Sequence, residues 1–302
     1  MRIASIKGND LAVVTDKAFI LIGDALAQRG ALMRGASMID LITRYDALKS
    51  AIAEAAERVT VVQADHTRLD PPVPVPSKIW AAASNYRRGG TGISDTAGRG
   101  AATEVSPDAL LEMAFLKPPS AVIGPEDAVV IPKDAEAVFP ELELCVVIGK
   151  KCRNVSVDEA MDAVFGYTII LDMTARTYAA IQAPSALIGT RCVRKGYDTF
   201  APIGPWIATR DEIPNPQGLL AQLWVNGELT QSATTEAMIN GVPRLVSYLS
   251  RVGTLYPGDL IATGNPDSPE FQRSLAPGDT MRAEIERIGA MNLRVVAASD
   301  RG

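Results

Sequence analysis

Two glutamates separated by a single residue form the first candidate site. Glu141 and Glu143 stand in the segment Phe139–Gly149, FPELELCVVIG, where an apolar and β-branched run begins. Side chains alternate between the two faces of a strand, so both carboxylates are expected on one face. Neighbouring carboxylates on a rigid strand are ligands for a hard cation such as Mg²⁺, Mn²⁺ or Ca²⁺. The same spacing also fits a half-exposed strand whose polar face is simply solvated.

Three other places carry groups that could join such a site. Asp172 ends the apolar run that starts at Gly166, and Lys195 precedes an aromatic and proline-rich turn. Thr263 and Gly264 follow a short apolar run at a tight turn. Taken singly, each has an ordinary interpretation as a cap, a surface cation or a loop. Their chemistry therefore depends on whether the fold brings them together.

The composition limits the partners of the protein. The chain has 302 residues, 47% of them hydrophobic and 22% charged, which is typical of a globular protein with a full core. A net charge of −5 argues against a nucleic-acid partner, which would require a basic face. Three cysteines without CxxC spacing, no signal-peptide pattern and no apolar run of ~20 residues predict a cytoplasmic protein without a membrane partner. We expect a small-molecule ligand.

The elements that must position these residues are mostly strands. A proline cluster at 71–76 predicts a linker between a small N-terminal α+β domain, 1–70, and a main domain, 77–302. In the small domain we expect strands at 11–15 and 18–22 and helices at 38–45 and 47–59. Beyond residue 129, β-branched runs alternate with turn signals, and helices are expected only after the capping box at 156–159, ending at Gly166, and at 242–250. The fold class is therefore α+β and β-rich.

The order of the motifs makes the sequence recognisable. FLKPPS at 115–120 comes first, followed by ELELCVVIGK at 141–150 and by GYT at 166–168 leading to Asp172. KGYDTFAPIGP at 195–205 and GDLIATG at 258–264 complete the series. Together these motifs resemble the fumarylacetoacetate hydrolase family over residues 76–296. The resemblance implies a mixed β-sandwich or roll as the catalytic domain, and a homodimer.

The resemblance also implies roles for individual residues. Glu141, Glu143 and Asp172 match the family's ligands for Mg²⁺, or alternatively Mn²⁺ or Ca²⁺, and a site with three carboxylates should be unfavourable without its cation. Lys195 matches the family lysine beside the metal, where an ammonium group stabilises enolate or carboxylate charge. The resemblance also implies that five residues contact the substrate: Tyr86, Arg176, Gln182, Thr263 and Gly264.

One part of the family pattern is missing. Family members commonly follow an Asn-Tyr pair with a histidine and, three residues later, a glutamate that together deprotonate water, but this chain has Gly89 and Gly92 there. A general base contributes about 10²–10⁴-fold to rate, so something should replace the pair. Asp95 and Glu104, in the glycine-rich segment expected to form a lid, are the candidates. His66, which lies before the proline cluster, is expected to be a bystander.

We therefore expect a metal-dependent hydrolase that cleaves a C–C bond in an acylpyruvate or 1,3-diketo acid formed during aromatic-compound breakdown. The cationic segment with Arg87, Arg88 and Arg99 suits an anionic oxo-acid or diketone substrate. Decarboxylation or isomerisation through the same enolate needs no histidine base and is the first alternative. A ligand-binding protein that retains the metal site without turnover is the second.

Overall fold

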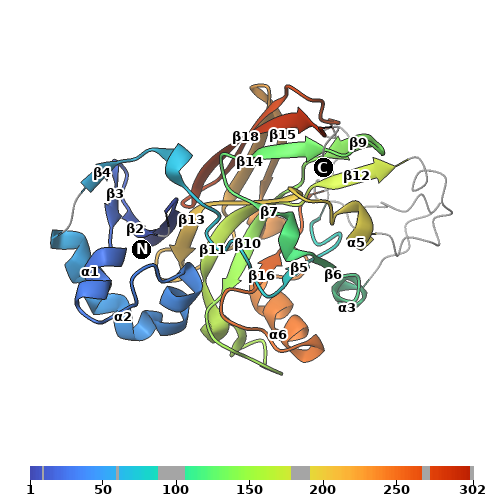
Figure 1. The fold of residues 1–302 in the computed structure, drawn as a ribbon. Helices are drawn as coiled ribbons and strands as arrows, with labels where there is room; N and C mark the ends of the chain where they lie inside the picture. The colour runs from blue at the N-terminus through green and yellow to red at the C-terminus, as the bar shows by residue number, and fades with distance from the viewer. Residues whose placement is uncertain (9, 59–60, 88–105, 178–190, 267–272, 300–302) are drawn as a thin grey trace.

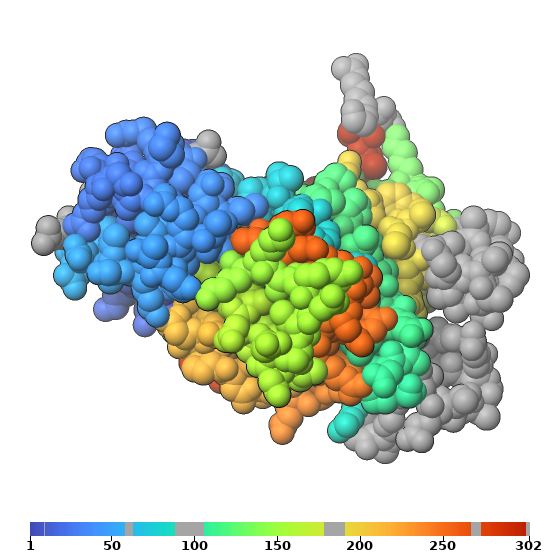
Figure 2. All heavy atoms as spheres, turned by 90° about the horizontal axis from the view of Figure 1, so that it is seen from below, coloured from blue at the N-terminus to red at the C-terminus, as the bar shows by residue number. Residues whose placement is uncertain are grey.

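Two packed β-sheets form the body of the protein, with a smaller lobe at one end (Figure 1). The computed structural model describes residues 1–8, 10–58, 61–87, 106–177, 191–266 and 273–299. The N-terminal lobe, blue in Figures 1 and 2, lies beside the body that contains the candidate site residues. The β-rich α+β class expected from the sequence is confirmed.

Among the described residues, the larger sheet has eleven strands. Their order is β4 (Val61–Gln63), β3 (Ala18–Leu21), β2 (Asp10–Val14), β1 (Arg2–Ile6), β13 (Ala201–Thr209), β11 (Val164–Leu171), β10 (Leu142–Ile148), β16 (Leu260–Ala262), β5 (Ile79–Ala81) and β6 (Phe115–Lys117), with β7 (Val122–Ile123) beside β13. The second sheet runs β15 (Glu228–Thr234), β14 (Leu220–Val225), β17 (Thr280–Ile285), β18 (Gly289–Ala297) and β8 (Ala128–Ile131). A separate pair joins β12 (Thr174–Thr177) to β9 (Ala135–Phe139).

The helices are short, except for one in the lobe and one in the body. They are α1 (Gly23–Gln28), α2 (Met38–Arg58), α3 (Pro107–Leu111), α5 (Arg191–Arg194) and α6 (Val242–Val252), and the 3₁₀ turns are η1 (His66–Arg68), η2 (Pro119–Ala121), η3 (Ala160–Ala163) and η5 (Thr235–Ala237). No helix among these described residues is long and apolar enough to cross a bilayer.

The centre of the body is a sandwich. Strands β13, β11 and β10 of the larger sheet contact β18, β17 and β14 of the smaller one. Every residue of β10, β11 and β13 is buried, which explains why their sequences are nearly continuous apolar runs rather than alternating ones. Because these strands have packed neighbours on both faces, they form a rigid base on which side chains at their ends can be held.

The N-terminal lobe continues the larger sheet. Strand β1 pairs with β13, with Arg2 opposite Ala208 and Ile3 opposite Ile207. The two strands predicted at 11–15 and 18–22 are present as β2 and β3. The division into domains at 71–76 stays a prediction. The larger sheet extends through both the N-terminal lobe and the body.

Two helix predictions were wrong in detail. The patterns at 38–45 and 47–59 form one helix, α2, because the buried side chains Leu41, Tyr45, Leu48 and Ile52 keep a spacing of three or four residues across the expected break. The capping box forms, with the Glu159 N–H donating to Ser156 Oγ at 3.3 Å, yet only the 3₁₀ turn η3 follows. The chain enters β11 at Val164, before a full helix could develop.

Candidate metal centre and active site

The three predicted metal ligands meet at the end of the β10–β11 pair. Glu141 directly precedes β10, Glu143 lies within it, and Asp172 follows β11. The antiparallel register sets Leu142 opposite Leu171, and the Asp172 N–H donates to the Glu141 carbonyl oxygen at 2.8 Å. One carboxylate oxygen from each acid lies within 4.8 Å of the others. Glu143 is only 2% exposed, so the alternative of a solvated polar face is wrong for this residue.

Each carboxylate is oriented by a hydrogen-bond donor of its own. Thr174 Oγ1 donates to Glu141 Oε1 at 3.0 Å, and the Gly264 N–H donates to Glu143 Oε2 at 2.6 Å. Lys117 Nζ donates to Asp172 Oδ1 at 2.7 Å. Partners of this kind hold metal-ligating side chains in position and raise their affinity for the ion.

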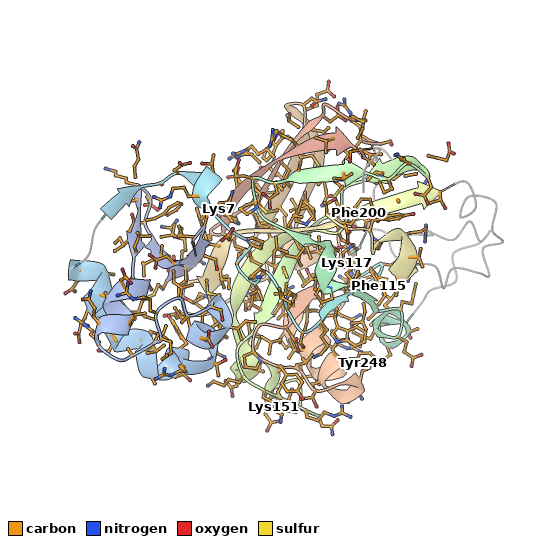
Figure 3. The ribbon with its side chains drawn as sticks, viewed as in Figure 1. Lys7, Phe115, Lys117, Lys151, Phe200 and Tyr248 are labelled. Carbon is orange, nitrogen blue, oxygen red and sulfur yellow. The ribbon has the colours of Figure 1, made fainter. Side chains whose placement is uncertain are left out.

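Two buried lysines balance part of the negative charge. Lys195 Nζ bridges Glu141 Oε2 at 2.9 Å and Asp172 Oδ2 at 2.7 Å. Lys117, whose side chain is fully buried beside Phe115 (Figure 3), contacts Asp172 and the Lys195 carbonyl oxygen. These two ammonium groups offset part of the repulsion expected among three carboxylates without a cation. The role of Lys117 was missed because a lysine at the end of a short strand resembles an ordinary surface residue.

The charges act unequally on the groups of the site. Burial raises the pKa of Glu143 well above its usual range, and the charges of Asp172 and Glu141 add to that effect. Burial also opposes ionisation of Asp172, but Lys117 and Lys195 outweigh it and lower the pKa of that acid. Burial lowers the pKa of Lys117, whereas Asp172 and Glu141 overcome burial at Lys195 and raise its pKa. Lys195 is therefore a permanent cation at neutral pH.

The position of Lys195 depends on the single turn of α5. The Lys195 N–H donates to the Arg191 carbonyl oxygen at 3.0 Å, and Gly196 follows directly. A Cβ on Gly196 would lie 2.4 Å from the Cys192 carbonyl oxygen, so no larger residue fits there without a shift. The Lys195 ammonium also lies 5.5 Å from the Phe115 ring centroid. The side chain is thus fixed from both ends.

The turn after β16 orients a metal ligand. Thr263 is fully buried and its hydroxyl donates to the Leu144 carbonyl oxygen at 2.9 Å. Gly264 has φ +86°, the left-handed region that glycine tolerates, and this conformation directs its N–H at Glu143. Tyr86 lies buried nearby, and burial raises its pKa. Substrate contact by these three residues stays a prediction.

Other predicted residues lie at the margin of the site or outside the described part. Arg176, on β12, is exposed and its guanidinium carbon lies 4.7 Å from the Phe139 ring centroid. The remaining predicted positions fall outside the described residues: Gln182, Asp95, Glu104, Gly89 and Gly92. His66 packs in the N-terminal lobe between Phe19 and Trp206, with ring centroids 6.1 and 5.5 Å away, as expected for a bystander.

Gln231 is a residue of the site that sequence reasoning missed. Its side chain accepts from the Leu142 N–H at 3.1 Å and donates to the Leu142 carbonyl oxygen at 2.9 Å. It thereby holds the backbone between Glu141 and Glu143. It comes from β15 of the other sheet, so no local pattern could have placed it there.

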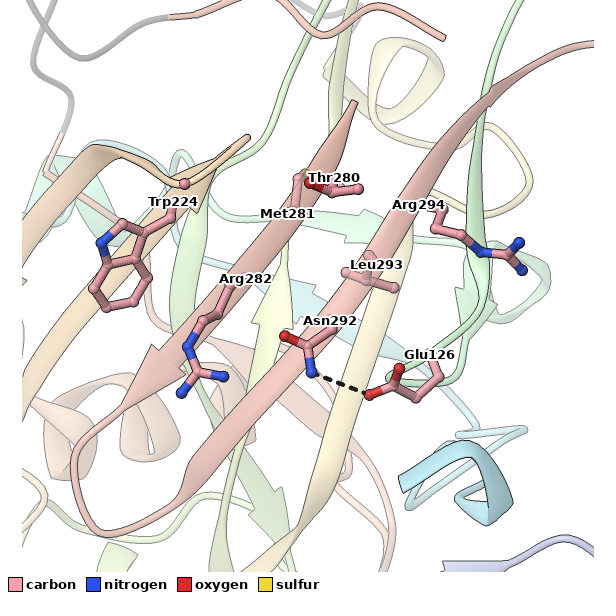
Figure 4. A pocket seen from close by; sticks show the side chains of 9 residues that line it. Glu126, Trp224, Thr280, Met281, Arg282, Asn292, Leu293 and Arg294 are labelled. Atoms are coloured by element: carbon pink, nitrogen blue, oxygen red, sulfur yellow. Dashed lines mark hydrogen bonds between the residues drawn. The ribbon is translucent and has the colours of Figure 1, made fainter. Parts of the chain in front are cut away.

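A concavity lies away from the carboxylate cluster, on the outer face of the smaller sheet. It encloses about 480 Å³ beside Trp224, Arg282 and Asn292, whose amide donates to Glu126 (Figure 4). None of the predicted site residues lines it.

The chemistry of the donor set fits a divalent metal. Three converging carboxylates, two of them deeply buried, offer the hard oxygen ligands that Mg²⁺, Mn²⁺ and Ca²⁺ prefer. Lys195 adds a fixed cation at the same point. With a divalent cation held by these carboxylates, the arrangement could bind an oxygen-rich anion, and Lys195 could stabilise negative charge that develops on it.

Comparisons with known proteins agree with this geometry. The family model described as fumarylacetoacetate (FAA) hydrolase C-terminal matches residues 78–296. A maleylpyruvate hydrolase of Aquipseudomonas alcaligenes is 35% identical over 297 residues, 98% of this chain and 99% of that relative. The crystal structure of maleylpyruvate hydrolase from Sphingobium sp. SYK-6, in complex with manganese(II) ion and pyruvate, has a TM-score of 0.79 at 35% identity, covering 99% of this chain and 100% of that one.

An isomerase is similar as well. The crystal structure of 2-hydroxyhepta-2,4-diene-1,7-dioate isomerase from Mycobacterium marinum has a TM-score of 0.66 at 28% identity and covers 99% of this chain and 100% of that one. The family model matches more than half of the chain, and the maleylpyruvate hydrolase relative is matched over nearly its full length. The chain belongs to the fumarylacetoacetate hydrolase family.

Proposed function

We propose that this protein is a divalent-metal-dependent hydrolase that cleaves the C–C bond of an acylpyruvate or related 1,3-diketo acid, in the breakdown of aromatic or similar compounds. The observation that carries the proposal is the junction of Glu141, Glu143 and Asp172 with the bridging ammonium of Lys195. Pyruvate, bound with manganese in a similar maleylpyruvate hydrolase, is the product expected when an acylpyruvate is hydrolysed.

The residues would divide the work as follows. Glu141, Glu143 and Asp172 would hold the cation, for which we propose Mg²⁺, and the cation would polarise the substrate oxygens. Lys195 presents a fixed positive charge where enolate charge develops, and it needs no reorganisation during the reaction. Lys117 keeps Asp172 ionised and oriented.

The bond changes are those of hydrolysis. Water adds to the distal carbonyl carbon, the C–C bond breaks, and its electron pair passes to the pyruvyl fragment as an enolate. That enolate then takes a proton to become pyruvate, and the acyl fragment leaves as a carboxylic acid. Asp95 and Glu104 are our candidates for the group that removes the proton from water.

Isomerisation or decarboxylation through the same enolate is the second candidate function. It is favoured by Gly89 and Gly92, which leave the chain without the histidine and glutamate of the family pattern. A similar solved structure is also that of an isomerase.

Product analysis separates these reactions. Purified protein with Mg²⁺ or Mn²⁺ is given an acylpyruvate, a 2-hydroxydienoate and oxaloacetate, while enol absorbance is followed and pyruvate is measured with a coupled dehydrogenase. Hydrolysis yields equal amounts of pyruvate and acid, whereas isomerisation changes absorbance without pyruvate. Turnover of the acylpyruvate should disappear in Glu143→Gln and persist in the exposed control Glu136→Gln. Binding without any turnover would refute the hydrolase.

Two further expectations stay proposals. A homodimer in solution is expected, and sedimentation would test it. A cytoplasmic location is expected from the free cysteines Cys145, Cys152 and Cys192.

A further inference from the structure

A buried asparagine contacts the turn that orients Glu143. Asn85 is 1% exposed and follows Ser84, whose φ of +52° lies in a backbone region that residues other than glycine rarely adopt. The Asn85 Nδ2 donates to the Asn240 carbonyl oxygen at 2.9 Å and to the Thr263 carbonyl oxygen at 2.8 Å. The Asn85 Oδ1 accepts from the Asn240 N–H at 2.8 Å. The side-chain amide therefore uses both of its N–H groups as donors and its oxygen as an acceptor.

The main chain holds Asn85 in the same place. The Asn85 carbonyl oxygen accepts from the Ile239 N–H at 2.7 Å, and the next residue, Tyr86, pairs with Met238 in an isolated antiparallel bridge. Because hydrogen bonds fix both the backbone and the side-chain amide, the two donors of Asn85 keep one direction.

A single peptide group connects Asn85 to a metal ligand. The Thr263 carbonyl and the Gly264 N–H belong to the same peptide bond, and they point in opposite directions because a trans peptide is planar. The carbonyl oxygen accepts from Asn85, and the N–H donates to Glu143 Oε2 at 2.6 Å. A hydrogen bond that holds the oxygen on one side therefore directs the N–H on the other. It also polarises the peptide group and makes the N–H a better donor.

Without this contact the peptide group could rotate. Gly264 has a φ of +86°, and glycine can leave this region as readily as it enters it. A rotated peptide would direct the Thr263 carbonyl oxygen at the Glu143 carboxylate, where two acceptors repel each other. The other polar groups of Thr263 are already fixed, because its N–H and its hydroxyl donate to the Leu144 carbonyl oxygen at 3.0 and 2.9 Å. Asn85 supplies the contact that selects one orientation of the peptide.

We infer that Asn85 is a positioning residue for the metal site, acting on Glu143 through the peptide between Thr263 and Gly264. The inference rests on the proposed function, because it takes Glu143 as a ligand of the divalent cation. In this role Asn85 needs no contact with the cation or the substrate. It keeps one Glu143 oxygen hydrogen-bonded, so the carboxylate is already oriented when the cation binds.

A double-mutant cycle with Mn²⁺ tests the inference. Asn85→Ala and Gly264→Ala should each lower the Mn²⁺ affinity measured by calorimetry about tenfold. If both act through the same peptide, the double variant should also lose about tenfold, whereas independent effects would multiply to about a hundredfold. The matched control is Ser250→Ala, which should leave the affinity unchanged. It removes two hydrogen bonds of a buried hydroxyl to the backbone, one to Ser247 at 2.8 Å and one from Val155 at 3.1 Å.

A spectroscopic measurement detects the peptide itself and needs no turnover. The pair Thr-Gly occurs twice in the sequence, at 91–92 and 263–264, so threonine with a ¹³C carbonyl and glycine with ¹⁵N give two selected amide signals. Gly264→Ala identifies the second signal by its loss. The short hydrogen bond to Glu143 should place the Gly264 amide proton downfield. Asn85→Ala should move this proton upfield, and Ser250→Ala should not.

Two outcomes would overturn the inference: losses of affinity that multiply in the double variant, or a Gly264 signal that Asn85→Ala leaves unchanged. Asn85→Asp keeps the size and the acceptor of the side chain but not both donors. It replaces Asn85→Ala if that variant does not fold, with the same results expected. If no acylpyruvate is hydrolysed, the proposed hydrolase fails, while the Mn²⁺ affinities and the Gly264 signal still decide the role of Asn85.

Discussion

Replacing Asp172 with asparagine should destabilise the metal-free protein far more than replacing Glu143 with glutamine. Both changes remove one carboxylate from the same cluster and should abolish tight metal binding. The two carboxylates differ in the groups that donate hydrogen bonds to them. Asp172 accepts hydrogen bonds from Lys117 and Lys195 at 2.7 Å each, and all three side chains are buried.

The magnitude follows from these contacts. Two charges 2.7 Å apart attract by ~6 kcal/mol at an effective dielectric constant of about 20, before desolvation is subtracted. Removing one partner of a buried ion pair costs about 3–5 kcal/mol, and Asp172→Asn leaves two ammonium groups under-compensated. Glu143 instead accepts from the Gly264 N–H at 2.6 Å, which a glutamine oxygen can also do. Since burial and two like charges oppose ionisation of Glu143, its replacement should cost less than about 1 kcal/mol.

Urea unfolding measures this difference directly. Free energies of unfolding are compared in EDTA and in Mn²⁺ at about 100 times the wild-type dissociation constant, where binding should add about 2.7 kcal/mol to the wild type. Both variants should lose that increment in Mn²⁺. In EDTA, only Asp172→Asn should have a substantially lower free energy of unfolding than the wild type. The exposed Glu136→Gln should match the wild type in both conditions. If the two variants lost the same free energy of unfolding in EDTA, the assignment of Asp172 as the partner of both buried lysines would be refuted.

Three other predictions concern the lysine, the turn and the lobe. Lys195→Met should lower kcat by about 10²–10³-fold, because the fixed cation is lost, while Mn²⁺ affinity measured by calorimetry stays equal or increases. Weaker binding would contradict this electrostatic role. Gly264→Ala should cost about 1–2 kcal/mol in urea unfolding and lower Mn²⁺ affinity about tenfold, because φ +86° is strained for alanine and the new Cβ would lie 3.0 Å from Asn85 Cβ. Burial raises the pKa of Asp211, but hydrogen bonds from Lys49 and Thr209 outweigh it and lower the pKa to about 2 from an ordinary 3.8. The contribution of the Asp211 carboxylate to the free energy of unfolding is therefore complete above pH ~4 and is lost as the pH falls toward 2. Asp211→Asn should lower Tm at pH 7 and flatten the Tm profile below pH 4, and an unchanged profile would contradict the assignment.

Much of the local structure could be predicted from the sequence because local patterns encode it. The apolar runs that became β10 and β11 indicated buried strands, and the spacing of Glu141 and Glu143 indicated two carboxylates at one strand end. The order of the motifs pointed to the family that the comparisons confirmed. These features depend on residue periodicity and on short segments, which the sequence displays directly.

Local signals misled where neighbouring elements decided the outcome. The capping box at Ser156 forms, but the 3₁₀ turn η3 ends after four residues because the chain then pairs in the central sheet as β11. In α2 the helix is longer than expected, because one continuous apolar face packs against the other buried side chains of the lobe and the expected break does not occur. In both cases tertiary packing outweighed a signal worth about 1 kcal/mol.

Only the tertiary structure decided how the site is charged. Lys117 and Asp172 are 55 residues apart in sequence, and Gln231 lies 89 residues from the backbone that it holds. The sequence by itself determined that carboxylates stand at a strand end and suggested a cation between them. Which ammonium groups balance those carboxylates depends on contacts between segments that are distant in the sequence. Coulomb energies depend on the distance between charges and on their burial, and the order of residues in the sequence gives neither quantity directly.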